Sequence, residues 1–160
     1  MESTISIKPH HFVDIISSFG AGEMVFKPHP YGHAVHIVSE KIDSEREVYL
    51  KIELGIDDIC QPCVHNVDGC CDDTIDTSFR PLAPVSKNEY NLLIDKRWCE
   101  RLGIKQGDRL KAREMCERIR DKMGDITDIY QENPAEKTAG RSAKLIKGLE
   151  YYLGNSEDLV

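Results

Sequence analysis

The chain has 160 residues and a formal charge of −7, from 21 lysines and arginines against 28 aspartates and glutamates. This length suffices for a domain with its own hydrophobic core, so disulfides are not required for stability. The basic residues are scattered along the sequence, which argues against a broad surface for nucleic acid or an anionic membrane.

The first half of the chain predicts two strands and two helices. Apolar residues that alternate with polar ones indicate half-buried strands, and apolar residues that recur every three or four positions indicate helices. Pro9 ends the first strand, and Gly20 is a candidate cap of the first helix. The expected elements are a strand over 4–8, a helix over 10–20, a loop over 20–32, a helix over 33–42 and a strand over 48–54.

The second half predicts three further helices. Ser86 and Glu89 form a candidate capping box for the first of them. A turn over 103–109 separates it from the second, and a break at "ENP" precedes the third, after which the last few residues are expected to be disordered. The expected buried stripes are Tyr90, Leu93, Ile94, Trp98 and Leu102, then Ala112, Met115, Cys116, Ile119 and Met123, then Leu145, Ile146, Leu149, Tyr152 and Leu153.

These elements predict an α+β fold, with a small sheet of short strands, four to five helices and a cysteine-rich loop that binds a cluster. We expect a single domain over residues 1–160, with the C-terminal helix at about 135–153 as an extension. No signal peptide and no run of about eighteen apolar residues occurs, which indicates a cytoplasmic protein without a membrane span.

The stretch "DDICQPCVHNVDGCC", residues 57–71, contains four of the six cysteines, in the spacing Cys60-x2-Cys63-x6-Cys70-Cys71. In a reducing cytoplasm such clusters are more often ligands or catalytic groups than cystines. The C-x-x-C step curls into a turn that lets two thiolates reach one centre, and Gly69 lets the chain return with a third. Zinc and an iron–sulfur cluster both fit this spacing.

A reactive thiol pair fits the sequence less well. The thioredoxin-like motif lies between a strand and a helix that lowers the pKa of one thiol, whereas here the motif lies in a loop rich in Asp and Gly. Negative neighbours raise the pKa of a thiol. The aspartates concerned are Asp57, Asp58, Asp68, Asp72 and Asp73.

The segments "IKPHHFVDII" and "DDICQPCVHNVDGCC", with "LGI" and "GD" further on, resemble the family of domain of unknown function 1284, small proteins of bacteria and archaea. The likeness extends over most of residues 4–123 and leaves the C-terminal helix without a counterpart. The resemblance implies iron–sulfur binding. The paired histidines of the family match His10 and His11, and its loop cysteines match Cys60, Cys63 and either Cys70 or Cys71.

One position departs from the family pattern. Asp14 occupies a place where many members have cysteine, so the last ligand is open: Asp14, Cys71, Cys99 or His11 can supply it, or one iron stays free. We expect Cys60, Cys63 and Cys70 as ligands, with Cys71, Asp14 or Cys99 as the fourth. Cys116 lies on an apolar stripe and is expected to be a buried, inert thiol.

The histidines allow two interpretations. His10 and His11 begin a helix, where they either satisfy local backbone groups or face the cluster, with His11 and Asp14 as a proton-transfer pair. His29, His33 and His36 form a second group, which we interpret as a polar face rather than a site. His65 lies within the loop, where it can ligate or donate a hydrogen bond to a thiolate.

The sequence thus favours a cytoplasmic protein with one iron–sulfur cluster of the four-iron type, used for electron transfer or redox support of a partner enzyme or small molecule. The first alternative is an enzyme in which an open iron acts as a Lewis acid and His10 and His11 serve as acid and base. The second is an interaction module stabilised by zinc.

Overall fold

The computed structural model describes residues 3–157, and side-chain positions up to residue 154. Over this range the chain folds into five α-helices, one 3-10 turn, a three-stranded sheet and a separate two-stranded sheet, which confirms the α+β class. The disorder expected for the last few residues concerns positions at the end of the chain that lie outside the described range. None of the described helices is both long enough and apolar enough to cross a membrane.

The three-stranded sheet forms one wall of the core. Strand β1 (Thr4–Ile7) pairs in parallel with β2 (Tyr49–Ile52), which pairs antiparallel with β5 (Arg109–Lys111). The first two match the predicted strands, whereas β5 begins at the end of the predicted turn. Because side chains alternate along a strand, one face of the sheet is apolar, and its buried residues are Ile5, Ile7, Leu50, Ile52 and Leu110.

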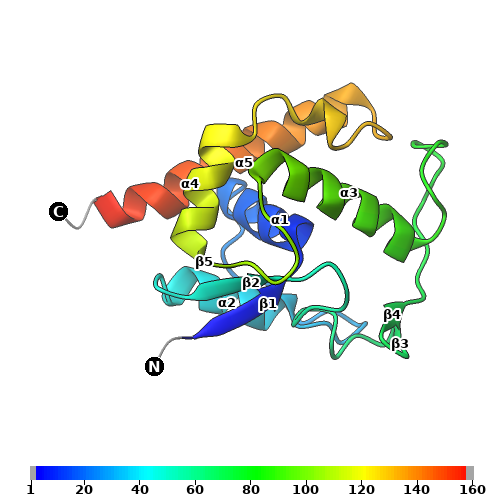
Figure 1. Ribbon diagram of the computed structural model, residues 1–160, viewed down its shortest axis with the longest axis horizontal. Helices are drawn as coiled ribbons and strands as arrows, with labels where there is room; N and C mark the ends of the chain where they lie inside the picture. Colours follow the sequence, from blue (N-terminus) through cyan, green and yellow to red (C-terminus); the bar gives the residue numbers. More distant parts are fainter. Residues whose placement is uncertain (1–2, 158–160) are drawn as a thin grey trace.

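The helices cover this sheet in the arrangement of Figure 1, with α1 in the centre of the molecule, packed against α3 and α5. Pro9 stands in the first turn of α1, where the missing N–H of proline costs nothing. The elements are α1 (Pro9–Gly20), α2 (Val35–Ser44), α3 (Lys87–Leu102), α4 (Ala112–Lys122), the 3-10 turn η1 (Ile126–Asp128) and α5 (Ala135–Glu157).

Two glycines let α1 and α5 approach each other closely. A Cβ atom at Gly20 would lie 2.0 Å from the carbonyl oxygen of Lys144, and one at Gly148 would lie 1.8 Å from that of Ile16. Gly20 is the last residue of α1 and does not adopt the left-handed conformation of a capping glycine. The capping role predicted for Gly20 is therefore wrong. Its lack of a side chain instead allows α1 to lie close against α5. The C-terminal helix is consequently part of the core.

The helix α3 begins as predicted, since the Ser86 side chain accepts a hydrogen bond from the Glu89 backbone N–H at 3.2 Å. Most of the predicted stripes are buried, but Leu93 of α3 and Ile146 of α5 are 36% and 47% exposed. A charged residue, Asp95, is fully buried on α3 instead. A buried carboxylate needs partners, and those of Asp95 lie at the start of α1.

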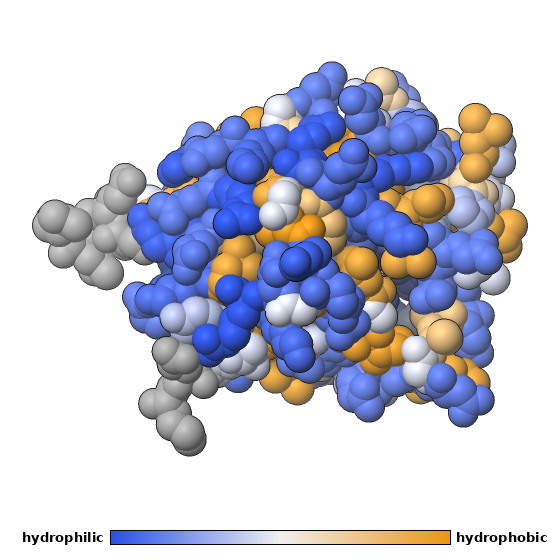
Figure 2. All heavy atoms as spheres, viewed as in Figure 1, coloured by the Kyte–Doolittle hydropathy of each residue, from blue (hydrophilic) through white to orange (hydrophobic). Residues whose placement is uncertain are grey.

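The second sheet stands apart from the core. Strands β3 (Asn66–Val67) and β4 (Cys70–Cys71) form a short antiparallel hairpin within the cysteine loop. Figure 1 shows it at the edge of the molecule, at the far end from the C-terminus of α5. The long loop from β4 to α3 rises along the same edge, and Figure 2 shows hydrophobic side chains on its surface there. Leu82 and Val85 of that loop are 88% and 59% exposed.

Candidate functional site

One cavity of about 190 Å³ lies between α1, the start of α2, the cysteine loop and the first turns of α3. It brings together segments that are far apart in the sequence, including both motifs that the sequence marks out. The side chains able to bind metal by sulfur or nitrogen that line it are three thiols and three imidazoles: Cys60, Cys63, Cys71, His11, His33 and His65.

The C-x-x-C segment forms the predicted turn. The backbone N–H of Cys63 donates to the carbonyl oxygen of Cys60 at 2.9 Å, which closes the turn and leaves both side chains lining the cavity. The backbone N–H of His65 donates to the sulfur of Cys63 at 3.5 Å. Hydrogen bonds to sulfur stabilise a thiolate and tune a bound centre, so Cys63 is partly prepared for the role of ligand.

The hairpin β3–β4 decides which of the two adjacent cysteines faces the cavity. Asp68 and Gly69 have φ angles of 52° and 82°, as in the tight two-residue hairpin turn for which Asp-Gly is a preferred sequence. Neighbouring residues of a strand point to opposite faces. Cys71 therefore lines the cavity, whereas Cys70, one of the three expected ligands, is exposed and lies outside it.

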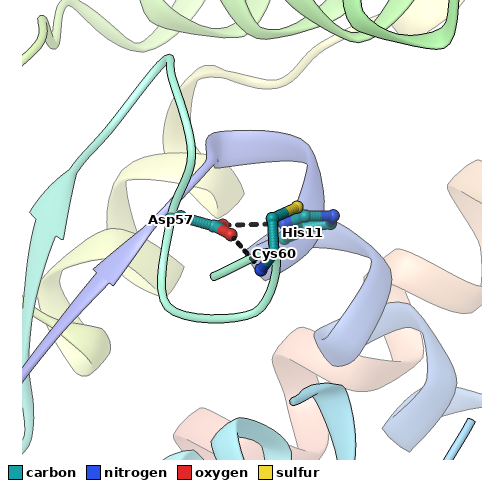
Figure 3. Close-up of side chains that lie close together, drawn as sticks. All are labelled: His11, Asp57 and Cys60. Carbon is teal, nitrogen blue, oxygen red and sulfur yellow. Dashed lines mark hydrogen bonds and ion pairs between the residues drawn. The ribbon is translucent and has the colours of Figure 1, made fainter. Parts of the chain in front are cut away.

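Asp57 lies between His11 and Cys60, two of the residues that line the cavity (Figure 3). Its Oδ2 accepts hydrogen bonds from the Lys8 backbone N–H and from His11 Nδ1, both at 2.7 Å. Its Oδ1 accepts from the backbone N–H groups of Ile59 at 3.1 Å and Cys60 at 3.0 Å. The carboxylate thus joins the start of α1 to the cysteine loop.

The same contacts set the tautomer of His11. An ionised carboxylate only accepts hydrogen bonds, so His11 Nδ1 is the donor and Nε2 stays available. His11, Asp57 and Cys60 offer ligand atoms that all lie within 4.8 Å of one another. However, four donors already occupy the Asp57 oxygens, which is about the capacity of a carboxylate. Asp57 therefore orients the other two side chains and is a poor metal ligand itself.

Charge in the cavity follows from this burial. Burial, together with the Asp57 charge, raises the pKa of Cys60 to about 12, and Lys8 offsets part of the effect. Burial opposes ionisation of Asp57 as well, but the charge and hydrogen bond of His11 hold the pKa of Asp57 well below its usual range. The Cys60 thiol is thus protonated at neutral pH, as the sequence predicts for cysteines beside aspartates, and a metal has to displace that proton.

His10 faces away from the cavity. Its Nδ1 lies 2.9 Å and 3.0 Å from the two Asp95 oxygens, and its backbone N–H donates to Asp95 at 2.7 Å. Burial lowers the pKa of His10, but Asp95 outweighs burial and the net shift is upward. The pair caps the N-terminus of α1 from within the core, so its evident role is structural. The two adjacent histidines thus have different partners and different surroundings.

Several candidate residues lie elsewhere. Asp14 lines the cavity but accepts a hydrogen bond from Arg141 at 2.8 Å, and the partner of His11 Nδ1 is Asp57, so the pair of His11 and Asp14, one of the two interpretations of the sequence, is not present in the structure. Cys99 is buried on α3 away from the cavity, where burial and Asp95 raise its pKa to about 11. Cys116 is buried in the core, as expected for an inert thiol.

The second group of histidines is divided. His33 precedes α2 rather than lying on it, stacks on His29 with ring centroids 4.4 Å apart, and lines the cavity. Burial and the nearby His29 lower the pKa of His33. The Nδ1 atoms of His33 and His36 are buried, and neither has a hydrogen-bond partner among the described residues.

Two residues of the site were not recognised from sequence. In the sequence Asp57 is one of several negative neighbours of the cysteines, and Lys8 is the residue before Pro-His-His. Lys8 is 2% exposed and lines the cavity. The signal available was the position of both residues beside motifs, but only the tertiary contact between residues 8 and 57 shows their roles.

Comparison with known proteins gives a family but no activity. No curated protein and no solved structure is significantly similar to the chain. A family model matches residues 29–132, which include the cysteine loop, α2, α3 and α4. The Pro-His-His segment and α5 lie outside the match. Because the match covers more than half of its residues, the chain belongs to the family described as Protein of unknown function (DUF1284).

Proposed function

We propose that this protein holds a metal cofactor, an iron–sulfur cluster, in the cavity through Cys60, Cys63 and Cys71. The supporting observation is that these three thiols, and none of the other three, line one cavity together with three imidazoles. Cysteine thiolates are the usual ligands of such clusters, and the last ligand often comes from another part of the chain. His11, His33 or His65 is placed to be that ligand.

The spacing of the ligand atoms favours a cluster over a single ion. Sulfurs on one tetrahedral zinc ion lie about 3.8 Å apart, because each Zn–S bond is about 2.3 Å long. Within the described residues, the group of three or more potential ligands that meets a 4.8 Å limit is His11, Asp57 and Cys60, and it contains a saturated carboxylate. The three cavity thiols are more widely spread, as a larger inorganic centre requires. Zinc, with the protein as an interaction module, remains the alternative.

A bound cluster would supply an electron that the protein passes to a partner. Cys63, His65 and Cys71 are only partly buried, so the centre would lie close to the surface, within reach of a partner protein or small molecule. Exposed apolar residues on the loop from β4 to α3 lie at the same edge of the molecule. A reducing compartment, the cytoplasm, is part of this proposal because free thiols persist there.

A second candidate function is an enzyme with one open iron. The observation that favours it is the His11 ring, whose Nδ1 is held by Asp57 while Nε2 is left available in a cavity lined by thiols. That arrangement suits an acid or base. A small added ligand such as cyanide would change the electron paramagnetic resonance signal of an open iron, and would leave a fully ligated cluster unchanged.

Anaerobic purification with iron, sulfide and zinc analysis tests the proposal. We expect bound iron and sulfide with a broad visible absorption band, and a loss of most of both in Cys63→Ser and Cys71→Ser. Cys70→Ser is the matched control, since it changes the adjacent, outward-facing thiol, and it should keep its iron. Zinc without sulfide would establish the alternative. Equal iron loss in the Cys70 and Cys71 variants would refute the assignment of ligands.

A further inference from the structure

Lys8 places a positive charge at the cavity, and no side chain of the described residues binds its ammonium group directly. The side chain is 2% exposed and lines the cavity. Its backbone N–H binds Asp57, but among the described residues the ammonium group has no hydrogen-bond or ion-pair partner. A buried charge is unfavourable unless it is paired, and a lysine without a partner in a cavity is therefore a sign of a ligand.

The carboxylates around the cavity are committed elsewhere. Asp57 holds four donors, as described above. Asp73 pairs with Lys87 at 3.3 Å, and Asp14 pairs with Arg141 at 2.8 Å. The oxygens of these carboxylates already accept other donors, so an oxygen that binds the Lys8 ammonium is expected to come from outside the protein.

The rest of the lining indicates what kind of anion fits. Ile15, Phe26, Val35 and Ile59 line the cavity and would contact an apolar body. The buried Nδ1 of His33, also in the lining, has no partner among the described residues and offers a second polar contact. A cavity of about 150 Å³ in another protein holds benzene, so one of about 190 Å³ suits a molecule of roughly six to eight non-hydrogen atoms.

We propose that the cavity binds a small organic carboxylate, with its charged group at Lys8 and its apolar part against the wall formed by α1 and the start of α2. This inference goes beyond the metal cofactor and does not require it. A metal centre would use the thiols, whereas the carboxylate would contact Lys8 and the apolar side chains of the lining. A four-iron cluster contains about as many non-hydrogen atoms as the cavity holds, so the carboxylate and such a cluster would compete for the cavity.

Calorimetric titration of the full-length protein with butyrate tests the proposal. Lys8→Met keeps the length of the side chain and removes the charge, and it should weaken butyrate binding about tenfold to a hundredfold. Lys96→Met is the control, because Lys96 is exposed on α3 and does not line the cavity, and it should change binding less than about threefold.

Two further ligands distinguish a carboxylate site from a site for neutral molecules or for inorganic anions. Butyramide, the neutral analogue, and sulfate, an anion without an apolar body, should both bind more weakly than butyrate. Butyramide binding as tightly as butyrate would show that Lys8 does not recognise charge. Sulfate binding as tightly would show a site for inorganic anions. Either result overturns the proposal.

Metal content, measured on the same samples, keeps the two proposals apart. Butyrate binding that depends on Lys8 in metal-free protein supports the carboxylate site even if no cluster is ever found. A wild-type protein that contains iron but does not bind butyrate, and loses iron when Lys8 becomes Met, overturns it. In that case Lys8 balances the charge of the metal centre and the cofactor proposal stands.

Discussion

Replacing Asp57 by asparagine should strongly destabilise the protein, although the two side chains have almost the same shape. Asp57 is 2% exposed and joins the start of α1 to the cysteine loop through both of its oxygens. Asparagine places an NH₂ group where one oxygen was. If the NH₂ group replaces Oδ1, it faces the N–H groups of Ile59 and Cys60; if it replaces Oδ2, it faces the Lys8 N–H, while His11 can accept by changing its tautomer.

The size of the effect follows from those contacts. An unsatisfied buried donor costs about 1–3 kcal/mol, so one or two of them predict a loss of about 1–6 kcal/mol in the free energy of unfolding. A domain of this kind has about 5–15 kcal/mol in total, so the variant should fold but unfold at much lower denaturant concentration. The His11 ring also loses its charged partner, which frees its orientation.

Urea denaturation at neutral pH measures this loss. Asp58→Asn is the control, since Asp58 is the exposed neighbour and holds one backbone N–H, that of Ser6, at 2.9 Å. It should cost less than about 1 kcal/mol. Because the pKa of Asp57 is lowered by folding, its contribution is present above the unfolded value near 4 and is lost as pH falls through the lower folded value. A variant no less stable than Asp58→Asn would refute this account of the site.

Two further predictions concern the core. Folding raises the pKa of His10, so its pairing with Asp95 stabilises the protein fully below the unfolded value of about 6.5 and less as pH rises through the folded value. The stability difference between wild type and His10→Gln should therefore fall as pH rises above about 6.5, and a constant difference would contradict the pairing. Gly148→Ala should lower the free energy of unfolding by at least about 2 kcal/mol, because its Cβ would overlap the Ile16 carbonyl oxygen. Gly140→Ala, at an open position of the same helix, should instead raise it by about 0.5–1 kcal/mol. Similar melting temperatures for the two variants would refute the close packing of α1 and α5.

Much of the secondary structure was predictable because its signals are local. Alternation in residues 4–8 and 48–54, and the stripes of the helices, depend on side chains that are near one another in sequence. The features that the sequence did not predict depend instead on contacts between distant parts of the chain. The three residues of β5 form a strand because β2 offers them hydrogen bonds, and the glycine at position 20 is required by a helix more than a hundred residues away. The hairpin β3–β4, in contrast, has a local signal, since Asp68-Gly69 is a preferred sequence for its two-residue turn.

For the site, the sequence by itself determined which residue types are present: a turn-forming C-x-x-C pair, two more cysteines, and histidines beside a proline. Only the tertiary structure decided which of them share a cavity. In the two-residue strand β4, neighbouring side chains point to opposite faces, so Cys71 lines the cavity and Cys70 does not. His10 and His11 lie in different surroundings because His10 pairs with Asp95 and His11 pairs with Asp57. For the histidines the physical reason is that their orientation and burial depend on hydrogen bonds between segments 46 to 85 residues apart, which no spacing along the chain encodes. For the cysteines the hairpin signal is local, but which face of the hairpin meets the cavity depends on how it packs against the rest of the chain.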